Sequence, residues 1–188
     1  MNQLVQAANV GAKFDAGLDA AAAANIGMIR MKSTYRFECF DADGNLKWEE
    51  TVDNLVVNVG LNDLLSNYFK GSSYTAAFYV GLKDAGTVAA GDTMSSHSGW
   101  TEDTSYSNST RPALTLGSVS GQSVDNSASK AVFTINGTAT IAGAFVTTSS
   151  TKGGTTGVLY GAADFGAARS VLSGDTLNLT VTLTATGT

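Results

Sequence analysis

A strict alternation of apolar and polar side chains near the C-terminus restricts the fold of this chain more than any other feature. The alternating residues are Leu177, Asn178, Leu179, Thr180, Val181, Thr182, Leu183 and Thr184. Successive side chains of a β-strand point to opposite faces, so this run predicts a strand over residues 175–186 with one buried side. Such a strand needs a second layer of structure to cover its apolar face.

The same periodicity predicts a β-hairpin earlier in the chain. Tyr35, Phe37 and Cys39 occupy alternate positions of a first strand. Residues 41–45 then supply turn chemistry, with Gly44 suited to a positive φ angle. Residues 46–52 read as the return strand.

One helix is predicted over residues 59–69. Asn58 is a candidate N-cap, and Gly71 lies where the helix should end. The apolar residues at helical spacing are Leu61, Leu64, Leu65 and Tyr68. We expect the three leucines to pack one face of the helix against a sheet.

The rest of the chain predicts short strands and one long polar loop, residues 84–112. The 23 threonines favour strands and the 21 glycines supply turns. Strands are expected at residues 78–82, 113–119, 130–136, 139–147, 157–165 and 175–186. The sequence therefore predicts a mainly β protein, an antiparallel β-sandwich of about eight strands with one short helix, over residues 32–188. A loop as long as 84–112 is typical of functional or assembly-related segments.

Residues 1–31 are interpreted as an N-terminal arm. Their large apolar residues are sparse, and Gly11, Gly17 and Gly27 interrupt any helix that the alanine run 20–24 begins. Two alternatives remain open at this point. The arm is either a disordered terminus or a segment that becomes ordered against neighbouring subunits.

Charge and length exclude several classes of protein. The formal net charge of −5, without a run of Lys or Arg, predicts no nucleic-acid partner. No apolar run approaches the roughly 20 residues of a membrane span, so no membrane association is expected. Cys39 is the one cysteine, which excludes an internal disulfide. Six of the 27 charged residues fall in 114–188, so strands of this half have little protection against edge-to-edge association.

Candidate catalytic residues have simpler structural interpretations. His97 is the one histidine, and no nucleophile motif accompanies the serines around it. Cys39 lies on an alternating strand face and is expected in the core. Adjacent Glu49 and Glu50 would face opposite sides of a strand, which disfavours a pair of catalytic acids. We therefore predict no enzyme activity and no catalytic residues.

Binding motifs are equally weak. Asp41, Asp43 and Gly44 resemble a fragment of a calcium loop, but the glycine stands at the fourth position, so a hairpin turn is the better interpretation. Trp100 and Tyr106 are candidate sugar platforms of a carbohydrate-binding module, an alternative that stays open. No cofactor-binding or metal-ligating residues are predicted.

Several phrases of the sequence resemble small virion structural proteins of tailed bacteriophages. The similarity spans most of residues 35–183. It is carried by residues 40–48 (Phe-Asp-Ala-Asp-Gly-Asn-Leu-Lys-Trp), 54–56 (Asn-Leu-Val), 58–62 (Asn-Val-Gly-Leu-Asn), 78–82 (Phe-Tyr-Val-Gly-Leu), 141–145 (Ile-Ala-Gly-Ala-Phe) and 173–177 (Ser-Gly-Asp-Thr-Leu).

This resemblance implies a β-sandwich without a cofactor, bound in many copies to a capsid or tail. The first expectation is a capsid decoration or cement protein, a homo-oligomer that contacts the major capsid protein. The alternative is a tail, neck or fibre-associated component. Either would be made in the host bacterial cytoplasm and function in the virion, which agrees with the unpaired Cys39 and with no export signal being recognised at residues 20–24.

Overall fold

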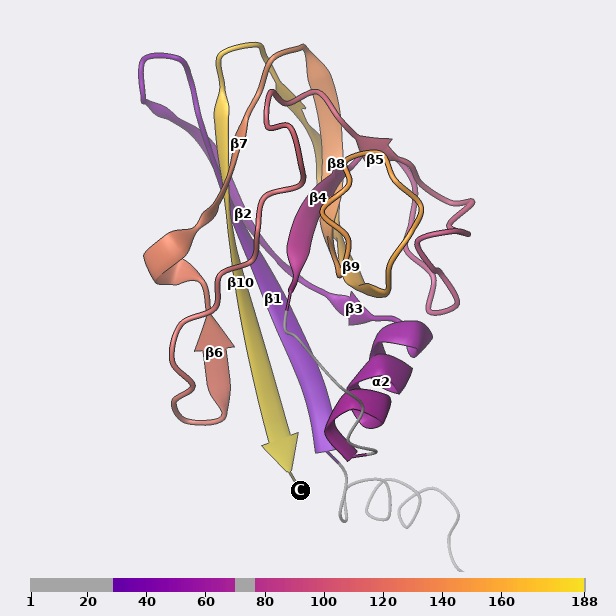
Figure 1. The fold of residues 1–188 in the computed structure, drawn as a ribbon. Helices are drawn as coiled ribbons and strands as arrows, with labels where there is room; N and C mark the ends of the chain where they lie inside the picture. Colours follow the sequence, from indigo (N-terminus) through magenta and orange to yellow (C-terminus); the bar gives the residue numbers. More distant parts are fainter. Residues whose placement is uncertain (1–28, 70–76, 188) are drawn as a thin grey trace, which may run out of the picture. The chain divides into compact units, whose positions relative to one another are not determined.

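The alternating C-terminal segment forms a strand with one buried side, as its pattern predicts, and the structure places this strand inside a β-sheet. The computed structural model describes residues 29–69 and 77–187. The first sheet has the strand order β2-β1-β10-β6, and β7 also pairs with β10 (Figure 1). Its strands are β1 (Ile29–Phe40), β2 (Leu46–Asp53), β6 (Ser123–Asp125), β7 (Ala131–Thr134) and β10 (Thr176–Gly187). The proposed arm falls on residues 1–31, and residues 1–28 lie outside the described part of the chain.

The second sheet has the order β3-β9-β8-β4-β5. Its strands are β3 (Leu55–Val56), β4 (Tyr79–Lys83), β5 (Glu102–Asp103), β8 (Ala139–Thr147) and β9 (Leu159–Val171). The predicted mainly β, antiparallel two-sheet architecture is confirmed, with ten strands in the described residues. The predicted strand 139–147 coincides with β8, whereas β9 continues six residues past the predicted end at 165.

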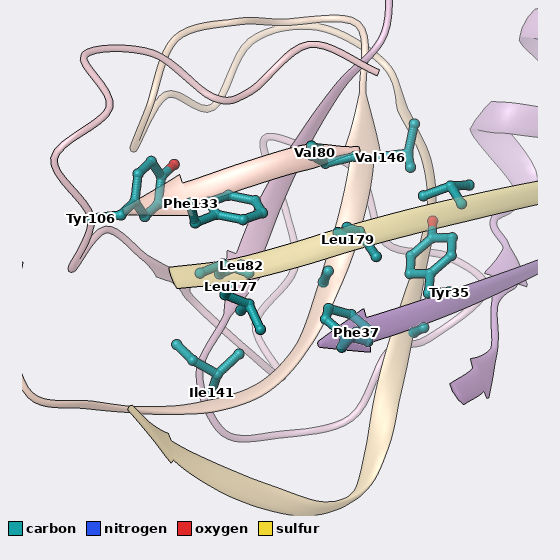
Figure 2. Close-up of a cluster of buried hydrophobic side chains, with 14 of the residues drawn as sticks. Tyr35, Phe37, Val80, Leu82, Tyr106, Phe133, Ile141, Val146, Leu177 and Leu179 are labelled. Carbon is teal, nitrogen blue, oxygen red and sulfur yellow. The ribbon is translucent and has the colours of Figure 1, made fainter. Parts of the chain in front are cut away.

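The core is built from the inward faces of both sheets. Tyr35, Phe37 and Cys39 of β1 are fully buried, as the alternation predicts, and the apolar face of β10 is buried beside them. Figure 2 shows Tyr35 and Phe37 together with Leu177 and Leu179. Phe37 meets Phe165 edge to face, with ring centroids 4.5 Å apart.

Three of the poorly charged C-terminal strands, β8, β9 and β10, lie inside the sheets, whereas β6 and β7 from the same half each pair with β10 alone. β10 is flanked by β1 on one side and by β6 and β7 on the other, and β8 lies between β4 and β9. One outer strand, β2, carries charged residues with partners inside the chain, such as Glu49 with Arg36 at 2.7 Å. The outer strands β2, β3 and β5 come from the more highly charged first half of the chain.

The predicted helix at residues 59–69 is confirmed to within one residue, but it differs from the prediction in the face that it buries. The α-helix α2 spans Asn58–Leu64 and continues as a π-helical turn, Leu65–Phe69. Val57, not Asn58, is the N-cap, without a side-chain hydrogen bond. Gly60 is the buried residue of α2, whereas Leu61 and Leu65 are 39% and 53% exposed. The predicted packing of these leucines is wrong, because the helix approaches β9 through its glycine.

The predicted strand 113–119 is also wrong. Ala113 makes an isolated bridge to Tyr79, and the Leu114 N–H donates to Phe78. The chain then leaves the sheet, and a strand that the sequence did not predict, β6, pairs with β10. Strand propensity alone does not choose the partner, because pairing depends on which backbone groups lie within reach.

The segment predicted as a loop, residues 84–112, contains the short strand β5, which pairs with β4, and it is held at both ends by buried cations. Lys83, at its start, is fully buried and contacts Asp164 at 2.7 Å. Arg111, near its end, is buried against Glu102.

Residues Met31–Ala185 form one compact unit. Among the described residues, no helix is long and apolar enough to cross a membrane.

Candidate functional site

The most distinctive surface feature is an apolar pocket of about 470 Å³. Its walls come from both sheets and from the helical segment. The lining residues in strands and helical segments are Met31 (β1), Asp63 and Leu64 (α2), Asn67 and Tyr68 (π-helical turn), Ser123 and Val124 (β6), Val146 (β8), Tyr160 (β9), and Leu183 and Ala185 (β10). The lining residues outside these elements are Phe78, Leu114, Val119 and Gln122.

The pocket is continuous with the hydrophobic core. Leu114, Val146 and Tyr160 belong to the core cluster and form part of the pocket lining. Phe78 meets Tyr160 edge to face, with centroids 5.7 Å apart. The pocket is therefore a part of the space between the layers that the described side chains do not fill.

Asp63 is the one charged residue among the described residues that line the pocket. Burial raises the pKa of the Tyr160 hydroxyl, and the negative charge of Asp63 raises it further. Tyr160 is thus a neutral hydroxyl at physiological pH. A pocket with this lining favours uncharged apolar groups, because a buried charge without a partner would be costly.

An exposed apolar row continues from the pocket along the helical segment. We call Leu61, Leu65 and Tyr68 the helix row, and Tyr68 is 78% exposed. Residues three and four apart lie on one face of a helix, so the row adjoins Leu64 and Asn67 of the pocket wall. Val119 adds a fourth exposed apolar side chain on the lining itself. Contiguous exposed apolar surface typically marks an interaction site.

The turn that carries Val119 toward β6 has an unusual backbone. Gln122 adopts a positive φ of 59°. Its carbonyl accepts a hydrogen bond from the Ala185 N–H at 3.0 Å. This bond ties the turn to β10, so the corresponding wall of the pocket is fixed by backbone contacts as well as by side chains.

His97 is placed by the structure beside a tryptophan. Its ring stacks on Trp100 at 4.0 Å, and Nδ1 donates to the Trp100 carbonyl at 2.9 Å. The indole Nε1 of Trp100 in turn donates to Asp92 at 2.9 Å. These contacts hold the loop together, and none of them pairs His97 with a serine hydroxyl.

Cys39 is buried, as predicted. Burial and the neighbouring Asp175 carboxylate raise the pKa of the thiol to about 11. The same carboxylate accepts a hydrogen bond from Lys47. A thiol that stays protonated at neutral pH is a poor nucleophile.

The acidic candidates do not converge on a site. Glu49 pairs with Arg36 on one side of β2, while Glu50 accepts from Gly166 N and Arg169 Nε on the other. Their predicted separation is confirmed. The Asp41 carboxylate accepts from the backbone N–H groups of residues 43 and 45, the hairpin turn that was predicted. Among the described residues, no group of acids, His and Cys could hold a metal ion.

The proposed sugar platforms are unavailable for stacking. Trp100 is 3% exposed and Tyr106 is fully buried. Trp100 packs against Phe145 and Tyr106 against Phe133. Both rings are core anchors of the loop, so this arrangement argues against the carbohydrate-binding alternative.

Sequence reasoning missed the buried polar centre around Arg111. Its Nε and Nη2 atoms donate to the two carboxylate oxygens of Glu102 at 2.9 and 2.7 Å. Further donation to the carbonyls of Ser149 and Gly154 connects the long loop to residues 148–157. The sequence pattern gives no signal for this pair, because a loop Arg and a loop Glu nine positions apart are usually solvated.

The fold is that of a two-sheet β protein with an apolar pocket on its surface. Comparisons with protein families, curated proteins and solved structures gave no match.

Proposed function

We propose that this chain is a non-enzymatic structural component of a tailed-phage virion, and in particular a capsid decoration protein that binds the shell in many copies. The apolar pocket and the adjoining helix row carry this proposal. They combine an unfilled cavity with exposed Leu61, Leu65 and Tyr68, a surface that is suited to burial against another protein.

The internal pairing of the buried charged side chains supports the same function. The buried cations Lys83 and Arg111 are each paired with a carboxylate and a backbone carbonyl inside the chain. Removal of one partner of such a buried pair is strongly destabilising, so these charged groups anchor the loop and are poorly placed for chemistry on a substrate. The sequence resemblance to virion structural proteins supplies the particular assembly.

A quantitative composition of purified virions tests the proposal. Peptides of this chain would be measured by mass spectrometry relative to those of the major capsid protein. A decoration protein is expected in a copy number comparable to that of the shell subunit. A copy number of a few per particle would instead favour the tail, neck or fibre alternative, and absence from the virion would contradict both.

A binding assay with particles gives an independent test of the apolar pocket and the helix row. Particles that lack the protein would be incubated with the purified chain and with the variant Leu65→Asp, which places a charge in the helix row. We expect the variant to bind less. Val132→Asp is the matched control, because Val132 is also exposed and does not line the pocket.

A further inference from the structure

A buried lysine reaches across one strand of the second sheet to meet an aspartate. Lys83 of β4 pairs in register with Gly143 of β8, and Gly143 pairs in register with Asp164 of β9. The three residues therefore form one row across three strands, on the same face of the sheet. A Cβ atom at Gly143 would stand 3.1 Å from Cδ of Lys83. Because Gly143 has no side chain, the lysine stem can lie over β8 and bring its amine to Asp164.

The amine and the carboxyl group are in close contact and are held by the loop that follows β4. Nζ of Lys83 lies 2.7 Å from Oδ1 of Asp164 and donates a hydrogen bond to the Gly86 carbonyl at 2.7 Å. Oδ1 is buried and accepts no hydrogen bond from the described residues, so its contact with Nζ is not an aligned hydrogen bond. Oδ2 accepts a hydrogen bond from the Val88 N–H at 3.0 Å. These contacts keep the two groups together, as an intramolecular reaction requires.

The surroundings of this pair are apolar. Lys83 is fully buried. The adjacent row on the same face holds Phe145 and Ala162, which form a buried apolar cluster with Trp100 of the covering loop. Two charges in such a place carry a large desolvation cost. A neutral amide in place of the ion pair would remove both charges and that cost.

We propose that Lys83 and Asp164 condense spontaneously to an isopeptide bond, which links β4 covalently to β9 across β8. Proton transfer within the pair gives a neutral amine and a carboxylic acid. Nζ then attacks Cγ of Asp164, an Nζ–Cγ bond forms and the Cγ–Oδ1 bond breaks. Oδ1 leaves as water with two protons that the ammonium group carried, so no oxidant or further reactant is needed. Oδ2 remains as the amide oxygen, and the Val88 N–H stabilises the negative charge that develops on it.

The bond goes beyond the proposed function and supplies the chain with a covalent cross-link. Cys39 is the one cysteine, so the chain has no internal disulfide. A link between residues far apart in the sequence restricts the unfolded chain as a disulfide does. The Asp164 side chain is 31% exposed, which gives the released water a path to solvent.

The mass of the denatured wild-type protein tests the bond, after the folded protein has been kept at neutral pH for several days. We expect a mass lower by one water molecule than the mass of the sequence. Trypsin should no longer cleave after Lys83, because its side chain has lost its charge, and tandem mass spectra should identify a branched peptide that joins Lys83 to Asp164. The full sequence mass, or a branched peptide at any other pair of residues, would overturn the proposal.

Two variants identify the atoms that are lost. Asp164→Asn keeps a carbonyl carbon that the amine can attack, so it should give the same linked product with loss of ammonia instead of water. Asp164→Ala lacks this carbon and should keep its full sequence mass; loss of water from this variant would overturn the proposal. Asp53→Asn is the matched control and should lose one water molecule like the wild type, because Asp53 also pairs with a lysine but is 69% exposed.

The wild-type measurement needs no variant, so it decides the proposal even where a substitution prevents folding. It also uses the purified chain alone, which separates it from the test of virion composition. Absence of the bond would leave the virion proposal intact, and absence of the protein from virions would leave the bond intact as a property of the chain.

Discussion

Gly60 of α2 lies directly against the carbonyl oxygen of Tyr160 in β9. A Cβ atom at Gly60 would stand 2.3 Å from that oxygen, a distance that requires backbone movement. The helix can therefore approach the sheet this closely because Gly60 has no side chain. This close approach turns Leu61 and Leu65 outward and leaves them exposed beside the pocket.

The first prediction follows from this contact. Gly60→Ala should destabilise the protein by about 1–3 kcal/mol, because the added methyl group meets rigid backbone although alanine favours helices. Leu65→Ala is the control and should cost less than about 1 kcal/mol, since its side chain is largely exposed. Urea unfolding curves measure both. A Gly60→Ala variant as stable as the wild type would show that helix and sheet separate at little cost.

Arg111 provides the second prediction. Arg111→Met leaves the buried Glu102 carboxylate without its cation and should cost about 3–5 kcal/mol. Lys32→Met removes an exposed pair with Asp53 and should cost about 0–1 kcal/mol. Chemical denaturation at neutral pH compares the two. Similar small losses would mean that water reaches Glu102 in the native state.

The Cys39 thiol gives a pH-dependent prediction. Its pKa is raised from 9.0 to about 11 in the folded protein, so the folded state retains a proton that the unfolded state releases. The associated stability is complete below pH 9 and is lost as the pH rises from about 9 to 11. Wild type should therefore lose more stability than Cys39→Ser across this interval. Thiol reagents at pH 8 should modify Cys39 after unfolding and leave the native protein unmodified; rapid native labelling would contradict the prediction.

The Glu38 carboxyl contributes stability that is lost at low pH, whereas that of the Cys39 thiol is lost at high pH. The hydrogen bond from Lys130, aided by the charges of Lys130 and Arg36, lowers the pKa of the Glu38 carboxyl below its ordinary value. The stability from this group is present above the unfolded pKa near 4.5 and is lost as the pH falls through the folded value. Glu38→Gln should flatten the acid limb of the stability profile, whereas Asp43→Asn, at an exposed turn, serves as the control. Parallel acid limbs for wild type and Glu38→Gln would refute this role.

Deletion of residues 1–28 tests the domain boundary together with the proposed function. The remaining chain begins with the complete strand β1, so we expect nearly the same thermal transition as for the full chain. Binding to particles that lack the protein should become weaker. Melting curves and particle occupancy measure the two effects. Full occupancy would exclude residues 1–28 from attachment, and loss of folding would show that they belong to the core.

The sequence by itself determined the elements whose pattern is local. The alternation around Leu179 predicted a strand with a buried side, and the turn chemistry at Gly44 predicted the β1–β2 hairpin, where φ is 85°. Side-chain periodicity reports which face is buried, because strand geometry fixes alternate directions without reference to the rest of the fold.

Tertiary structure alone decided the pocket and the contacts around it. The leucines at helical spacing predicted a buried face, but the approach of Gly60 to Tyr160 overrode that pattern. Likewise, residues 123–125, and not residues 113–119, form a strand that pairs with β10. Arg111 forms a buried ion pair with Glu102. Each outcome depends on which groups the packed layers bring within a few ångströms of each other. Periodicity specifies a face for burial, whereas the distance between layers decides which residue can fill the space and where space remains.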